Sequence, residues 1–172
     1  PFTLTGAQTR AIGEIIADFQ KGAPMNRLVQ GDVGSGKTMV AAAAAYCAAQ
    51  NGFQTALMAP TEILAEQHYA SLSKLFAPLG IGVALLTGSM TQKEKKAVRE
   101  ELLDGTVQIA VGTHALISDS TVFQRLGLVI TDEQHRFGVG QRSKLSAKGD
   151  DPHLLVMSAT PIPRTLALLM YG

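Results

Sequence analysis

A glycine-rich segment constrains this chain more than any other part of its sequence. The segment from Gly31 to Thr38 reads GDVGSGKT and matches the pattern G-x-x-x-x-G-K-[ST]. A short run that ends at Gln30 precedes it, and an alanine-rich stretch from Lys37 to Gln50 follows it. Glycines permit the backbone angles that turn successive N–H groups inward, and the start of a helix adds its positive end to the same concavity. The segment therefore predicts a strand, an anion-binding turn and a helix.

The anion that suits such a turn is the phosphate chain of ATP. In this pattern Lys37 reaches the β- and γ-phosphates, and the Thr38 hydroxyl is a ligand of Mg²⁺. The residues that we expect to hold the nucleotide are Gly31, Gly34, Ser35, Gly36, Lys37 and Thr38. A tight turn without a ligand is the alternative, but it does not explain why the constrained positions and both flanking segments agree.

Short apolar runs recur along the chain, and helical patterns separate them. The runs are 27–30, 55–58, 83–86, 107–111, 126–130 and 154–157. Each is too short for a stable helix and is typical of a strand buried on both faces. Ile12, Ile15, Ile16 and Phe19 share one face of a first predicted helix; further helices are expected over 37–50 and about 63–76. This alternation predicts an α/β fold, a mostly parallel sheet with helices on both faces and ligands at the carboxyl ends of the strands.

A fourth helix has the clearest boundaries. Thr91 to Glu94 forms a capping box, and Gly105 follows Asp104 as a C-terminal stop. Its polar residues include Lys93, Lys95, Lys96 and Arg99. These charges suit either a solvated helix face or a stripe that binds DNA. We favour the solvated face, because surface charge usually has no further role.

Two acidic residues follow the apolar run that ends at Ile130. Asp132 and Glu133 stand together at the predicted end of that strand. A nucleotide site with a metal needs a carboxylate there, so Asp132 is expected to bind Mg²⁺. Glu133 points the other way and is placed to deprotonate the attacking water. A helix cap or a solvated loop is the simpler explanation for one such acid, but a pair beside the glycine turn favours hydrolysis.

Composition limits the remaining possibilities. The 172 residues fit one domain, residues 1–172, and a net charge of +1 means that any contact with DNA must be local. The single Cys47 excludes an internal disulfide, and we interpret it as a core residue. The longest apolar run is well short of the roughly 20 residues that span a bilayer. The four histidines are widely scattered and show no zinc-binding spacing.

Several segments resemble the motifs of superfamily 2 helicases. Asp132 to His135 resembles the DExH box, and Ser158 to Thr160 resembles the third motif. Leu4, Thr5 and Gln8 are similar to the adenine-reading element. Three further segments resemble DNA-contacting motifs: Ala59 to Gln67, Leu86 to Ser89 and Gly112 to Leu116.

The longer strings resemble most closely the RecG family of bacterial branched-DNA helicases. They are GDVGSGKT, DEQHRFGVGQR from Asp132 to Arg142, and SATPIPRTLAL from Ser158 to Leu168. Transcription-repair coupling translocases share the ATPIPRT string, but that family is expected to carry another acid and a Gln where Gln134 and His135 stand. Primosomal restart helicases lack the RFGV continuation.

The resemblance implies a RecA-like P-loop NTPase lobe and a role for each matching residue. Gln8 would recognise adenine, while Lys37, Asp132 and Glu133 would catalyse hydrolysis. The implied DNA contacts are Thr61, Gly88, Thr113 and His114. The implied coupling residues, which link hydrolysis to movement, are His135, Ser158 and Thr160. Taken singly, Thr61, Thr113 and Ser158 are also explained as helix caps or turn residues, and Gly88 as a turn.

The resemblance also implies parts that this sequence does not contain. They are a second RecA-like lobe with an arginine finger and a DNA-recognition wedge domain. We therefore expect an excerpt of a longer cytoplasmic, nucleoid-associated bacterial helicase that uses ATP and Mg²⁺ to remodel stalled forks and Holliday junctions in recombination and repair. The alternatives are a lobe of a transcription-repair coupling translocase and an ATP-gated scaffold that does not hydrolyse ATP.

Overall fold

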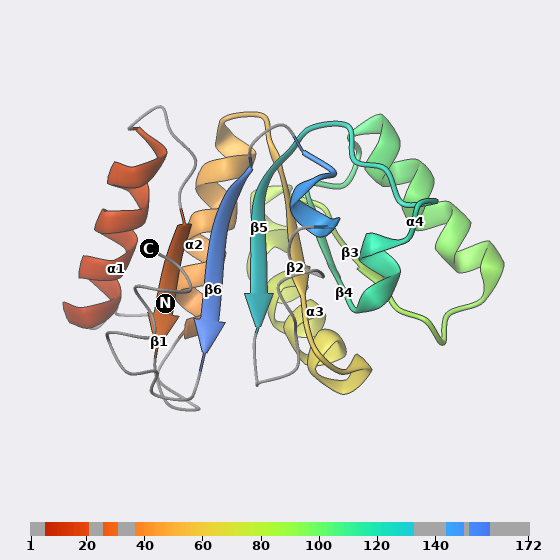
Figure 1. Ribbon diagram of the computed structural model, residues 1–172, viewed down its shortest axis with the longest axis horizontal. Coiled ribbons are helices and arrows are strands. Elements are labelled where there is room, and N and C mark those ends of the chain that lie inside the picture. The colour runs from red at the N-terminus through yellow and green to blue at the C-terminus, as the bar shows by residue number, and fades with distance from the viewer. Residues whose placement is uncertain (1–5, 21–25, 31–36, 133–143, 150–151, 159–172) are drawn as a thin grey trace.

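The chain folds around one twisted sheet (Figure 1). The computed structural model describes residues 6–20, 26–30, 37–132, 144–149 and 152–158. These residues form six parallel strands in the order β1-β6-β5-β2-β4-β3. The strands are β1 (Asn26–Gln30), β2 (Gln54–Met58), β3 (Val83–Leu86), β4 (Ile109–Gly112), β5 (Leu126–Asp132) and β6 (His153–Ser158). The predicted parallel α/β architecture is confirmed.

Helices cover both faces of this sheet, as the alternation predicted. They are α1 (Gly6–Phe19), α2 (Lys37–Gln50), α3 (Glu62–Phe76) and α4 (Gln92–Asp104), with short 3₁₀ turns η1 (Ala77–Leu79) and η2 (His114–Ile117). Residues of α1, α2 and α3 share one buried cluster with the sheet, whereas Leu102 of α4 packs in the cluster on the opposite face. Figure 1 shows α1 at the β1 end of the sheet and α4 at the β3 end.

The side-chain alternation of a buried strand explains the two layers of core. In β2, Leu57 joins the cluster that contains α2 and α3, while Ala56 and Met58 join the other. All five residues of this strand are buried, because β5 and β4 flank it and core packs on both faces. A continuous apolar run is the sequence pattern that such a strand requires.

The local signals for helix ends are also confirmed. At α4 the Glu94 backbone N–H donates to Oγ1 of Thr91 at 3.1 Å, and the Thr91 N–H donates to Oε1 of Glu94 at 2.9 Å. Gly105 then adopts a left-handed φ of 84°, which an L side chain rarely adopts. Gly52 has a φ of 82° and likewise ends a helix, because it lies two residues after the end of α2.

Three details differ from the expectations. Ile16 is 37% exposed although Ile15 is 1% exposed, because α1 lies at one end of the sheet and packs mainly on α2. Strand β4 begins at Ile109 rather than two residues earlier, and the Val107 carbonyl accepts a hydrogen bond from the Gln54 side chain instead. Cys47 is only partly buried, so it is not a full core residue.

Candidate functional site

Most of the described site residues lie at one edge of the sheet, where every strand ends. Across neighbouring strands, Gln30 pairs with Ser158 and Asp132 with Met157, and Met58 is opposite both Thr131 and Gly112. This edge divides into two halves. The strands β1, β6 and β5 precede or carry the predicted nucleotide and coupling residues, while β2, β4 and β3 lead into the predicted DNA contacts.

The nucleotide half is described in part. Lys37 is the first residue of α2, and Thr38 is half-buried in its first turn. Gln8 is partly buried in the first turn of α1. The other predicted residues of this half lie outside the described residues: Gly31, Gly34, Ser35, Gly36, Glu133, His135 and Thr160. Because α2 begins where the glycine segment ends, its N-terminus is placed as an anion site requires.

Asp132 ends β5 and is almost fully buried, with 5% of its surface exposed. Its Oδ2 lies 2.7 Å from Nε2 of His68, a residue of α3 whose side chain is only 13% exposed. A hydrogen bond from a ring nitrogen fixes the orientation of the carboxylate and compensates for part of its burial. The sequence alone predicts no role for His68, because the four histidines show no zinc-binding spacing.

A signal for His68 does exist in the sequence. The buried residues Ala65, Leu72 and Phe76 define the inward stripe of α3. His68 falls on that stripe, three residues after Ala65 and four before Leu72. A polar residue on a buried stripe needs a partner, so the spacing predicts that His68 has one without identifying it as Asp132.

The oxygen donors of this half suit Mg²⁺. Thr38 offers a hydroxyl and Asp132 a carboxylate, the ligand types that this ion prefers. Within the described part of the chain, no group of three His, Cys, Asp or Glu side chains is placed to hold a metal. Mg²⁺ usually binds through one or two protein ligands and completes its coordination with substrate phosphates and water.

Ser158 ends β6, between β1 and β5, and is 4% exposed. Its register partner is Gln30, directly before the glycine segment, and the preceding Met157 pairs with Asp132. The residue thus lies between the two strand ends that carry the predicted nucleotide chemistry. This position suits the predicted coupling role.

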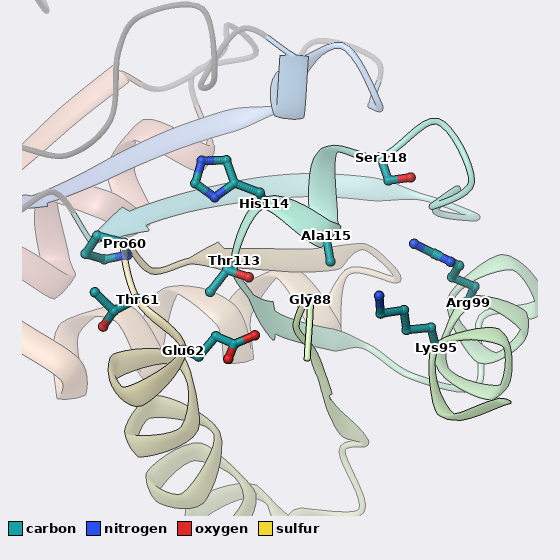
Figure 2. Close-up of a pocket in the computed structure, with 10 residues that line it drawn as sticks. All are labelled: Pro60, Thr61, Glu62, Gly88, Lys95, Arg99, Thr113, His114, Ala115 and Ser118. Carbon is teal, nitrogen blue, oxygen red and sulfur yellow. The ribbon is translucent and has the colours of Figure 1, made fainter. Parts of the chain in front are cut away.

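The four predicted DNA contacts line a single pocket of about 490 Å³ in the other half of the edge (Figure 2). They are Thr61, Gly88, Thr113 and His114. The remaining lining residues are Pro60, Glu62, Lys95, Arg99, Ala115 and Ser118. Motif residues that are far apart in the sequence therefore meet here, because the strands that precede them are neighbours in the sheet.

Local hydrogen bonds shape the wall of this pocket. Thr61 caps α3, and its Oγ1 accepts from the Leu64 N–H at 3.2 Å, so the capping explanation holds for its local role. The hydroxyl proton is still available to a phosphate, because a hydroxyl both donates and accepts. Oε1 of Glu62 accepts from the Ser89 N–H at 2.8 Å and thereby holds the turn that contains Gly88. Thr113 is 6% exposed and makes no capping bond with its side chain.

Helix α4 contributes two cations to the pocket that the sequence interpretation had assigned to a solvated face. That interpretation holds for Lys93 and Lys96, which are exposed, but Lys95 and Arg99 are partly buried and line the pocket. In Figure 2 both side chains reach from α4 toward η2 and Gly88.

Helical spacing could have identified these two cations. Lys95 and Arg99 share an i, i+3, i+4, i+7 stripe with Val98 and Leu102, and Leu102 is completely buried. Positive charges on an inward stripe are not ordinary solvated charges.

Comparisons with known proteins agree on one family. The DEAD/DEAH box helicase model matches residues 5–169. The whole chain is 58% identical to the ATP-dependent DNA helicase RecG of Synechocystis, 59% to that of Bacillus subtilis and 57% to that of Aquifex aeolicus. It spans 21%, 25% and 22% of those proteins, respectively, so it corresponds to about a quarter of their length or less.

The solved structures that match this chain are also helicases. The chain matches a structure of RecG bound to a three-way DNA junction with a TM-score of 0.87 and 52% identity, over all of this chain and 23% of that one. The helicase MrfA matches with a TM-score of 0.74 at 22% identity, over 98% of this chain and 29% of that one, which shows the fold alone. No helix among the described residues is long and apolar enough to cross a membrane.

Proposed function

Because the chain belongs to the DEAD/DEAH box helicase family, we propose that it is the ATP-binding motor lobe of a RecG-type helicase that remodels branched DNA. The observation that carries this proposal is similarity over the whole of this chain, at 52% identity, to 23% of a RecG whose structure was solved on a three-way junction. The pocket that collects Thr61, Gly88, Thr113 and His114 supports it. We place the intact protein at the bacterial nucleoid, because the relatives are bacterial DNA helicases.

The nucleotide half of the edge would perform the chemistry. Lys37 and the N-terminus of α2 bind the phosphates of ATP, and Thr38 and Asp132 hold Mg²⁺ against them. Bound MgATP supplies a γ-phosphoryl group whose charge the metal partly neutralises. His68 keeps the Asp132 carboxylate in one orientation. Glu133 accepts the proton of the attacking water, and Gln8 contacts adenine.

The DNA half would hold the sugar-phosphate backbone rather than the bases. Hydroxyls of Thr61 and Thr113 and the backbone at Gly88 are groups that bind phosphate without reading sequence. None of the described residues that line the pocket is Phe, Tyr or Trp, which leaves the imidazole of His114 as the aromatic ring of the described lining. Contact with the backbone alone suits an enzyme that steps along any sequence.

Helix α3 joins the two halves. Its N-cap Thr61 lines the pocket, and His68, two turns further along, binds Asp132. A shift of the DNA at Thr61 would therefore reach the metal-binding carboxylate through one rigid helix. His135, Ser158 and Thr160 are the residues that we propose to couple hydrolysis to movement on the other side of Asp132.

The active site would be completed by a second lobe. An arginine finger contributed by a partner surface accelerates hydrolysis about 10³–10⁵-fold in other NTPases. We therefore expect residues 1–172 alone to hydrolyse ATP poorly and the intact protein to be a DNA-stimulated ATPase. Turnover by the isolated lobe at the rate of the intact enzyme would contradict this part of the proposal.

The decisive test measures ATP hydrolysis by the intact protein with a three-way junction, a fork, a linear duplex and no DNA. A RecG-type enzyme is stimulated most by the branched substrates. Equal stimulation by linear duplex would favour the transcription-repair translocase. Absence of ATP turnover with every one of these DNAs, in the wild type as in Glu133→Gln, would favour the scaffold.

A further inference from the structure

We propose that Lys95 and Arg99 of α4 form a phosphate-binding clamp that extends the DNA track beyond the motif residues. This inference rests on the proposed function of the same pocket. It adds a segment that carries none of the helicase motifs and that sequence alone had assigned to solvent. Four observations support it: the direction of the two side chains, the way Arg99 is anchored, the local balance of charge and the chemistry of the lining.

Both cations point into the pocket from the same side of α4. They are four positions apart, at i and i+4, so they lie one above the other on the helix surface. Their neighbours on the stripe, Val98 and Leu102, pack in the core and fix the rotation of the helix. Lys95 and Arg99 therefore cannot turn fully to solvent without moving α4, although their long stems let the charged ends adjust.

Arg99 is anchored in a way that leaves its terminal nitrogens for a ligand. Its Nε donates to Oγ1 of Thr121 at 3.1 Å. The same hydroxyl, which is completely buried, donates to the Ala115 carbonyl of η2 at 2.9 Å. Within the described residues no hydrogen bond uses the two terminal nitrogens of Arg99, and the fork that they form binds phosphate in a bidentate manner.

The charges around the pocket favour an anion. Lys148 donates to the carbonyls of Ser118 and Thr121 at 2.8 and 2.7 Å, which brings a third cation to the loop that anchors Arg99. Burial lowers the pKa of the Lys148 ammonium; Asp119 opposes this shift and the Arg99 guanidinium adds to it. The repulsion between the two cations is relieved when an anion binds beside them.

Two acidic residues lie near the pocket, and their charge opposes that of the cations. Glu62 lines the pocket, but its Oε1 already accepts from the Ser89 N–H. Asp119 is exposed and does not line the pocket. Among the described lining residues the charge is therefore two cations against one engaged carboxylate.

The ligand that fits this arrangement is the phosphodiester backbone of DNA. The cations stand across the pocket from the Thr61 cap, with Gly88 and Thr113 between them (Figure 2). A track of hydroxyls, backbone N–H groups and cations follows a chain of phosphates better than it encloses one free ion. Lys95 and Arg99 would each neutralise one phosphate.

The experiment uses the intact protein and compares Lys95→Ala and Arg99→Ala with Lys93→Ala and Lys96→Ala. The second pair removes the same charge from exposed positions of the same helix. The measurement is the affinity for a fluorescent three-way junction at several salt concentrations, together with ATP turnover without DNA.

Loss of one phosphate contact reduces the slope of log affinity against log salt by about 0.7–0.9 and weakens binding roughly five- to eightfold near 0.1 M salt. We expect this change for Lys95→Ala and Arg99→Ala only, with DNA-independent turnover unchanged in the control variants Lys93→Ala and Lys96→Ala. Arg99→Lys should keep most of the slope and lose part of the affinity. Thr121→Val should behave like Arg99→Lys, because it frees Arg99 without removing its charge.

Equal salt slopes in all four alanine variants would overturn the clamp. If the wild type then still binds junctions and is stimulated by them, the proposed function stands and only the α4 contact is wrong. If the wild type neither binds nor responds to any DNA, the proposed function fails and the clamp fails with it.

Discussion

Nε2 of His68 lies 2.7 Å from Oδ2 of Asp132 and joins the third helix to the last residue of β5. The two residues are 64 positions apart in the sequence. They meet because β2, which leads into α3, pairs directly with β5. A residue on the helix that starts at the pocket lined by Thr61 thus controls the orientation of the carboxylate expected to bind Mg²⁺.

We expect His68→Ala in the intact protein to raise the Mg²⁺ concentration needed for half-maximal ATP turnover. Loss of a residue that orients a metal ligand typically costs about 10–100-fold in metal affinity or activity. His68→Gln retains an N–H donor, so its Mg²⁺ requirement should lie between those of the wild type and His68→Ala. Ser71→Ala, an exposed change further along α3, is the control. An unchanged Mg²⁺ dependence in His68→Ala would show that Asp132 needs no such support.

Lys37→Ala should abolish measurable ATP turnover by the intact protein with or without junction DNA. A charge-assisted contact to phosphate contributes about 1.5–3 kcal/mol in the ground state, and more when charge develops in the transition state. Junction binding in the absence of nucleotide should remain, since Lys37 belongs to the other half of the edge. Full turnover in this variant would refute the assignment of the glycine segment.

Gly88→Ala should separate stability from DNA binding. A Cβ at this position would come no closer than 3.7 Å to Oε1 of Glu62, an ordinary contact, so the thermal unfolding midpoint should not change. A methyl group on this turn would nevertheless keep a phosphate away from the Gly88 N–H. We therefore expect weaker junction binding at an unchanged melting temperature, and wild-type affinity would argue against a contact here.

Gly112→Ala, in contrast, should lower the stability of the protein. A Cβ there would overlap the Leu86 carbonyl oxygen and approach Leu116, at the end of the fully buried strand β4. Forced overpacking of this kind costs about 1–3 kcal/mol, and backbone on one side leaves little room for adjustment. The free energy of unfolding, measured in denaturant on the intact protein, should fall by at least that amount. A stable Gly112→Ala variant would mean that β3 and β4 separate more easily than the register suggests.

Gln54 offers a stability test outside the functional edge. Its buried side chain donates to the carbonyls of Leu102 and Val107 at 2.9 and 2.8 Å and accepts from the Arg125 N–H at 2.8 Å. Gln54→Leu leaves buried backbone groups without this partner, each at a cost of about 1–3 kcal/mol. We expect a lower free energy of unfolding for Gln54→Leu and little change for Gln124→Leu, whose side chain is exposed.

The sequence by itself determined the elements and the kind of chemistry. Apolar runs located all six described strands, and the Thr91 capping box and Gly105 fixed both ends of α4. These signals act between residues a few positions apart, so they survive without knowledge of the fold. The motif strings likewise carried the helicase resemblance, which the family match confirms.

Only the tertiary structure decided which residues meet. The order β1-β6-β5-β2-β4-β3 depends on how each helix crosses the sheet, and no local pattern encodes it. That order brings His68 to Asp132 and gathers Thr61, Gly88 and Thr113 around one pocket. It also turned Lys95 and Arg99 from apparent surface charges into part of that pocket, because the burial of Leu102 sets the inward face of α4. Contacts across a sheet join residues far apart in the chain, and their geometry exists only once the strands have paired.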